Sequence, residues 1–108
     1  MATFREFVKA LEEGVNALAR EQFDGFETDA VADMKAFLEK TKADLQRWTA
    51  LLVAKKITRQ DFSDLVKAKA ALAELHALTR AGIVLIKLER FRTGLINLVI
   101  DTAIRVYL

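Results

Sequence analysis

The sequence predicts an all-α protein, and three observations lead to this prediction. The chain contains no proline, and Ala, Leu, Lys and Glu, which favour helices, are frequent. Apolar residues recur at steps of three and four along most of the chain, which is the period of a helix with one buried face. No stretch shows the sustained two-residue alternation of a half-buried strand. We expect a four-helix bundle of antiparallel helices that forms a single domain over residues 1–108.

The first helix is predicted over residues 4–22. Thr3 and Glu6 have the spacing of a capping box, in which the threonine hydroxyl accepts from the glutamate amide at the start of a helix. Gly25 can adopt the left-handed conformation that follows a helix, and Thr28 is the expected N-cap of the next one. The apolar face of this helix consists of Phe4, Phe7, Leu11, Val15 and Leu18.

The second helix is predicted over residues 29–55 and has the clearest periodicity in the chain. Its apolar positions follow alternating steps of three and four, as in a heptad seam, and only Thr41 among them is polar. Such a seam predicts a long helix that packs against its neighbours at a shallow angle. The seam consists of Val31, Met34, Leu38, Thr41, Leu45, Trp48 and Leu52.

The third helix is predicted over residues 59–81. Thr58 is its expected N-cap, with Asp61 as the acidic partner three residues later. Ile57 and Phe62 flank this pair at the spacing of a hydrophobic staple. We therefore expect a tight turn between the second and third helices.

The same turn resembles a known family. The segment Leu51–Phe62 is similar to the helix-turn-helix of the bacterial short C-terminal domain family, which reads roughly L-x-x-G-x-I-T-x-x-E-F. Ile57 and Thr58 match the family's pattern, whereas Lys55 and Lys56 stand where the family usually has glycine. The resemblance implies shared turn chemistry at this point of the chain.

The last helix is predicted over residues 83–107, after a break at Gly82. Leu78, Gly82 and Ile83 have the spacing of a Schellman cap, with the glycine in the left-handed position. An unbroken rod of about 48 residues would be about 72 Å long, far longer than a globule of this size. Because the stretch Ile83–Ile86 offers no polar N-cap, the alternative is one continuous helix that is kinked at Gly82.

This last helix is apolar around an unusually large part of its circumference. Between Thr93 and Leu108 only Asp101 and Arg105 are charged. The pattern predicts contacts over about two-thirds of the helix surface, more than the usual amphipathic stripe requires. The polar residues form one narrow ridge of Arg90, Thr93, Asn97, Asp101 and Arg105.

One face of a four-helix monomer would leave part of such a helix exposed, so we predict a homodimer or higher homo-oligomer held together by it. The alternative is that this helix is the central, buried helix of a monomer. We expect the polar residues Asn97, Asp101 and Arg105 to fix the register across the interface. The candidate interface residues are Phe91, Leu95, Ile96, Leu98, Val99, Ile100, Ala103, Ile104 and Tyr107.

The sequence carries no motif of a catalytic, cofactor or metal site. It has no glycine-rich phosphate loop, no nucleophile–base–acid set and no cysteine. His76 is the only histidine, and no Glu-x-x-His pair of a di-iron bundle includes it. We therefore expect no enzyme activity and no cofactor.

These observations favour a non-catalytic, self-associating protein with a scaffolding or adaptor role, whose partner is a second copy or another helical protein. The net charge of +2 is too balanced to indicate nucleic-acid binding. An alternative is a peripheral membrane protein or membrane-complex subunit that uses the last helix and the basic residues Lys55, Lys56 and Arg59. The chain shows neither a signal-peptide pattern nor an apolar stretch of about 20 residues, so we expect a cytoplasmic location.

Overall fold

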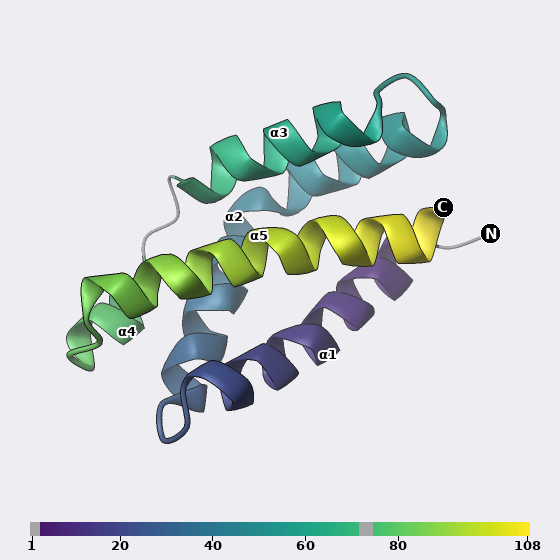
Figure 1. Cartoon of the computed structure of the whole chain (residues 1–108). Helices are drawn as coiled ribbons and strands as arrows, with labels where there is room; N and C mark the ends of the chain where they lie inside the picture. Colours follow the sequence, from purple (N-terminus) through teal and green to yellow (C-terminus); the bar gives the residue numbers. More distant parts are fainter. Residues whose placement is uncertain (1–2, 72–74) are drawn as a thin grey trace.

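The computed structural model describes residues 3–71 and 75–108 and confirms the all-α prediction. Over these residues the chain forms helices and no strand. None of the described helices is long and apolar enough to span a membrane. The elements, shown in Figure 1, are α1 (Phe4–Gln22), α2 (Glu27–Val53), α3 (Arg59–Ala71), the short α4 (His76–Arg80) and α5 (Leu85–Tyr107).

Helix α1 begins as predicted and α2 begins two residues earlier than predicted. The Thr3 hydroxyl accepts from the Glu6 amide at 3.2 Å, and Gly25 has a φ of 91° in the turn after α1. The expected N-cap Thr28 instead lies inside α2. The reason is Glu27, whose carboxylate accepts from the Gly25 amide at 3.1 Å and so stabilises a helix start within the turn. The pKa of Glu27 is lowered, first by a hydrogen bond from its own backbone amide and then by the one from Gly25.

Helix α2 is one unbroken helix of 27 residues, and most of its predicted seam is buried. The polar seam residue Thr41 is satisfied internally, because its hydroxyl donates to the Phe37 carbonyl at 2.8 Å. The helix ends in a Schellman turn in which the Lys56 amide donates to the Leu51 carbonyl at 2.9 Å. Lys55 occupies the left-handed position of this turn, with a φ of 59°.

The capping box of α3 forms as predicted. The Asp61 amide donates to the Thr58 hydroxyl at 3.0 Å, and the Thr58 amide donates to the Asp61 carboxylate at 2.9 Å. The backbone amide of Thr58, and after it the Thr58 hydroxyl, lower the pKa of the Asp61 carboxyl. Phe62 is buried, and the half-buried Ile57 packs against the same core. An ion pair of 3.0 Å between Lys69 and Asp44 joins α3 to α2.

The prediction of a single helix over residues 59–81 is wrong, because Leu75 is not helical. Its φ and ψ are −104° and 67°, and it stands immediately before α4. The stretch 72–74, which is part of the predicted helix, lies outside the described residues. A separate α4 is stabilised by Asp33, whose carboxylate accepts from the amides of Ala77 at 2.8 Å and Leu78 at 2.9 Å. Asp33 lies on α2 and is buried, so this cap joins two distant parts of the chain.

The predicted break at Gly82 is present, and it is a complete break rather than a kink. The Ile83 amide donates to the Leu78 carbonyl at 3.2 Å and the Gly82 amide to the Thr79 carbonyl at 3.1 Å, which is the Schellman pattern. Gly82 has a φ of 86°. Val84 is extended, and α5 begins after it.

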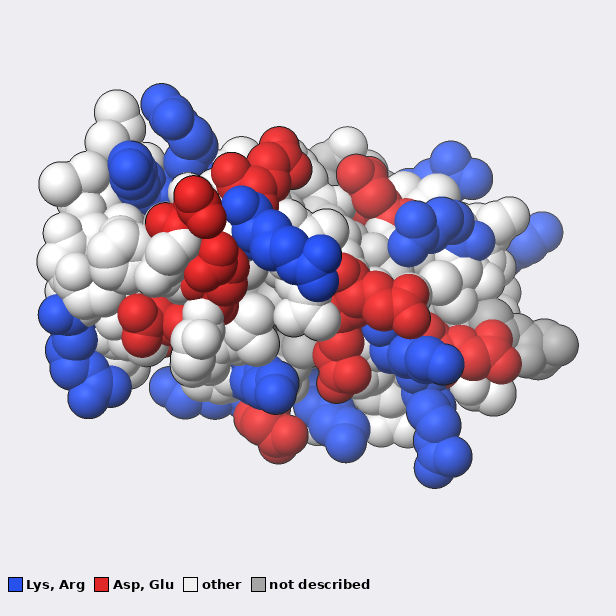
Figure 2. Space-filling view, turned by 90° about the horizontal axis from the view of Figure 1, so that it is seen from below, with Lys and Arg blue, Asp and Glu red and all other residues white. Residues whose placement is uncertain are grey.

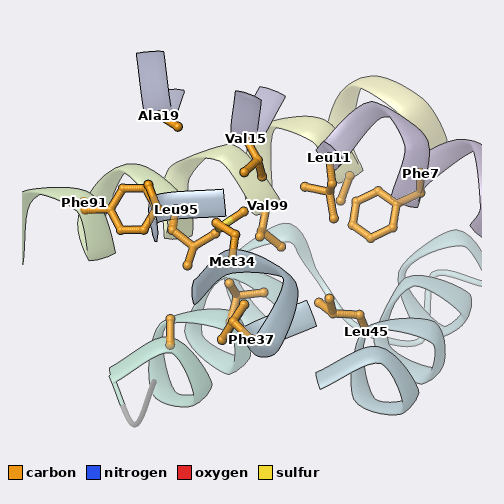
Figure 3. Packing of buried hydrophobic residues seen from close by; sticks show 14 of the residues in the cluster. Phe7, Leu11, Val15, Ala19, Met34, Phe37, Leu45, Phe91, Leu95 and Val99 are labelled. Carbon is orange, nitrogen blue, oxygen red and sulfur yellow. The ribbon is translucent and has the colours of Figure 1, made fainter. Parts of the chain in front are cut away.

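Helix α5 crosses in front of α2 and lies between α1 and α3, as Figure 1 shows. α5 packs closely on α1 at Gly14, where a Cβ atom would lie 2.5 Å from the Cδ1 atom of Leu98. Figure 3 shows the core between α1, α2 and α5, where Met34 lies close to Leu95 and Val99. The last helix therefore has neighbours from its own chain on several sides.

Candidate functional site

One row of the predicted interface belongs to the core of the chain itself. Phe91, Leu95, Val99 and Ala103 are each 0% exposed. They lie at four-residue steps on the face of α5 that meets the other helices, and Phe91 packs edge-on against Phe23 with ring centroids 5.0 Å apart. In this fold these four side chains have no surface left for a partner, so an interface on α5 must use other residues.

The flanks of the helix are partly covered by the same chain. Leu98 packs beside Gly14, and Ile96 and Ile100 are half-buried against the core. Tyr107 packs on Phe7 with ring centroids 5.6 Å apart. Burial raises the pKa of the Tyr107 phenol, although a hydrogen bond with Thr49 partly opposes this shift. The wide apolar surface that suggested a partner is thus largely accounted for by α1, α2 and α3.

The polar ridge of α5 faces solvent. Arg90, Thr93, Asn97, Asp101 and Arg105 are all exposed, so the three predicted register residues are accessible. Ile104, the remaining candidate interface residue, is half-buried. The ridge marks the face of α5 that α1, α2 and α3 leave uncovered.

Among the large apolar side chains of the described residues, the three most exposed lie at the start of α5. Val84, Leu85 and Ile86 are 56%, 71% and 66% exposed, and we call these three consecutive residues the tip patch. Lys87 and Arg90, which follow on α5, are also exposed. Figure 2 shows mostly uncharged surface at the left end of the molecule, the end that carries α4 and the start of α5 in Figure 1, with basic side chains beside it.

Sequence reasoning placed the tip patch in the last helix but not in the interface. The only signal was the run Ile83–Ile86, in which four apolar residues stand where a polar N-cap is expected. Ile83 is half-buried against the core and serves the Schellman turn. Val84, Leu85 and Ile86 neither pack against the core nor take part in the Schellman turn. Only the structure distinguishes these three residues from Ile83.

The described residues bring together no set of metal ligands. No group of three or more His, Asp or Glu side chains within residues 3–71 and 75–108 has the geometry to hold an ion. His76 is exposed at the first residue of α4.

Comparison with protein-family models, with curated proteins and with solved structures finds no match for this chain.

Proposed function

We propose that the protein is a non-catalytic helical adaptor that self-associates through the exposed face of α5. The observation that supports this proposal is the tip patch, in which three consecutive large apolar side chains are each more than half exposed. A cluster of exposed apolar side chains promotes non-specific association unless another surface covers it. Such clusters therefore mark interaction surfaces more often than isolated exposed apolar residues do.

The pattern along α5 suggests how two copies pair. Ile86 and Ile104 share one face of the helix, because their separation of 18 residues is about five full turns. The polar residues Thr93 and Asn97 lie on the same face between them. The exposed face thus has an apolar residue near each end and a polar centre.

This arrangement is self-complementary in an antiparallel pair. With a twofold axis near Leu95, Ile86 faces Ile104 of the partner subunit and Thr93 faces Asn97 of the partner subunit. On one flank of the same face, Arg90 lies opposite Asp101 of the partner subunit, and the symmetry makes this favourable charge pair twice. Arg105 lies beside the partner's tip patch, where its methylene groups can cover apolar surface.

We expect this dimer to be weak and dependent on concentration. A single helix face is small beside the roughly 1,600 Å² that a standard stable interface buries. Most of the apolar surface of α5 is already buried within the chain. Monomer and dimer should therefore both be populated as the protein concentration changes.

The first test is the molar mass in solution, by light scattering and sedimentation over a wide concentration range. Ile86→Glu should give a monomer at every concentration. It should leave the fold intact, because an acid in the first turn favours the helix dipole. Phe26→Glu is the matched control, since Phe26 is an exposed apolar residue outside α5, at 39%. A wild-type protein that stays monomeric, or equal effects of the two substitutions, would contradict the proposal.

The second test is disulfide trapping, which is clean because the chain contains no cysteine. A mixture of Ile86→Cys and Ile104→Cys proteins should form the mixed disulfide faster than either protein forms its own. Faster linking of Ile86→Cys to itself would indicate a parallel pair and rule out the antiparallel one.

A membrane surface is the second candidate, because basic residues surround the same patch. Arg80, Lys87 and Arg90 are exposed near Val84 and Leu85, a combination that suits an interface rich in anionic lipid. Flotation with phosphatidylserine vesicles distinguishes the candidates. Binding that is lost at high salt and in Leu85→Glu would favour the membrane, whereas absence of flotation together with dimerisation would favour self-association.

A further inference from the structure

A second surface, independent of α5, lies between α1 and α2. Two adjoining hollows of about 170 Å³ and 190 Å³ follow each other along these helices and share Glu12, Lys35 and Leu38 as lining residues. Further shallow hollows continue toward Val53 and Tyr107 at the other end of α2. We call this continuous depression the α1–α2 groove. From Val31 to Val53 its α2 wall extends about 33 Å at 1.5 Å per residue.

The groove has an apolar floor. On the α1 side it is formed by Phe4 and Val8, and on the α2 side by Val31 and Leu38, all of which are half-buried. Gly14 and Leu18 meet α5 from the other flank of α1, so the groove does not compete with the contact between α1 and α5. Each of the two hollows is comparable in size to one large apolar side chain. The groove therefore offers successive sites for apolar residues of an added helix.

The rim of the groove carries more basic than acidic residues. Its acids are Glu12 and Glu39, whereas its four exposed bases are Arg5, Lys9, Lys35 and Lys42. Within the part of the chain that the structure describes, no ion pair within 4 Å involves any of these four bases. Their charges are therefore accessible to an anionic partner.

We propose that the α1–α2 groove binds an amphipathic helix of a partner protein, with apolar residues spaced by three and four and acidic residues on either side of them. The apolar stripe would lie on the floor between α1 and α2, and two of its side chains would enter the two hollows. The acidic flanks would lie beside Lys35 and Lys42 on one wall and beside Arg5 and Lys9 on the other. Charge complementarity selects an acidic helix over a basic one.

The test uses a fluorescent peptide of about 18 residues, or five turns of helix, built from Leu, Ala and Glu with leucine at helical spacing. Two control peptides keep the same length: one has Lys in place of Glu, and the other has the same composition in scrambled order. Fluorescence anisotropy at low salt should show that the acidic amphipathic peptide binds about tenfold or more tightly than either control.

Charge reversal then locates the site. Lys35→Glu combined with Lys42→Glu should weaken binding of the acidic peptide by about tenfold or more. The matched control is Lys56→Glu combined with Lys67→Glu, which changes the net charge equally at exposed positions outside the groove and should leave affinity nearly unchanged. All four positions are exposed, so circular dichroism should show a folded protein in both cases.

Three outcomes would overturn the proposal. They are equal affinity for acidic and basic peptides, an equal loss in the two charge-reversed proteins, and no binding at millimolar peptide. The molar mass of Ile86→Glu does not depend on any of these results, so failure of the groove and failure of self-association remain distinguishable. Val8→Gln supplies an uncharged check, since it changes the floor without altering the rim and should also weaken the acidic peptide.

Discussion

Two turns of this protein have the same backbone design and differ in the helix start that each one precedes. In both, a Schellman pattern ends a helix, with Lys55 at a φ of 59° in one turn and Gly82 at a φ of 86° in the other. After the first turn, Thr58 caps α3 and Asp61 completes the box. After the second, Val84 stands in the N-cap position of α5.

The stability of the monomer explains the helix start after the first turn but not the one after the second. The turn before α3 has a polar cap that satisfies its helix start, together with a lysine in a conformation that favours glycine. The turn before α5 has the favourable glycine, but three exposed apolar residues come after it. Valine has no side-chain acceptor for the first amides of the helix. Exposed apolar side chains and an N-cap without an acceptor are unfavourable in a monomer. These features are the reason to look for a partner at the second turn.

The largest effect should come from Asp33, which holds α4 in front of the second turn. Asp33→Ala removes the acceptor of two backbone amides, those of Ala77 and Leu78, and should lower the free energy of unfolding by about 2–4 kcal/mol. Asp33→Asn keeps one acceptor oxygen and should cost less. Urea denaturation measures both changes. An alanine variant as stable as wild type would show that α4 does not depend on this cap.

The two left-handed positions should respond in opposite directions. Gly82→Ala should destabilise the protein by about 1–2 kcal/mol through backbone strain alone, because a Cβ atom there meets nothing within 4 Å. Lys55→Gly should stabilise it by about 0.5–1 kcal/mol, since it relieves the same strain. Both values come from thermal or urea denaturation. The same sign for the two substitutions would contradict the proposed equivalence of the turns.

A change at the N-cap of α5 should alter both stability and association, whereas a change at the N-cap of α3 should alter stability alone. Val84→Thr supplies the missing acceptor and should stabilise the monomer by about 1 kcal/mol while it weakens the dimer. Thr58→Ala makes the opposite change at the first turn, so it should cost about 1 kcal/mol and leave the dimer unaffected. Denaturation and light scattering on the same samples check both expectations. A tighter dimer in Val84→Thr would indicate that the tip patch is not in the interface.

The local fold could be predicted from sequence wherever its causes lie within a few residues. The N-cap at Thr3, the capping box at Thr58 and the Schellman cap at Gly82 are such cases, because each depends on side chains or a glycine at fixed short spacing. Asp33 shows the limit. Its partners Ala77 and Leu78 are 44 and 45 residues away, and a carboxylate on the second helix gives no sequence signal that it caps a helix start elsewhere.

The site was harder to predict because periodicity shows that a helix is apolar but not which neighbour covers it. Leu95 and Val99 have the same pattern whether α1 and α2 or a second copy buries them. In the structure α1 covers one flank of this helix, and Leu98 packs there beside Gly14. The place of this glycine in the middle of a predicted helix was a weak signal of close packing. The surface that remained for a partner was the exposed face and the tip patch.

The smallest expected effect concerns the acid sensitivity of the first turn. The pKa of Asp61 is lowered by its contacts with Thr58, so the ionised carboxylate stabilises the folded state, and this contribution is lost as the pH falls through the folded-state pKa, below 3.8. Asp61→Asn should therefore be less stable than wild type at neutral pH, and the difference should shrink toward pH 3. Hydrogen exchange of the Thr58 amide gives a local reading of the same change. The second turn lacks this carboxylate, because Lys87 stands at the matching position. If the difference in stability between Asp61→Asn and wild type persists unchanged at low pH, the charge of Asp61 does not stabilise the first turn.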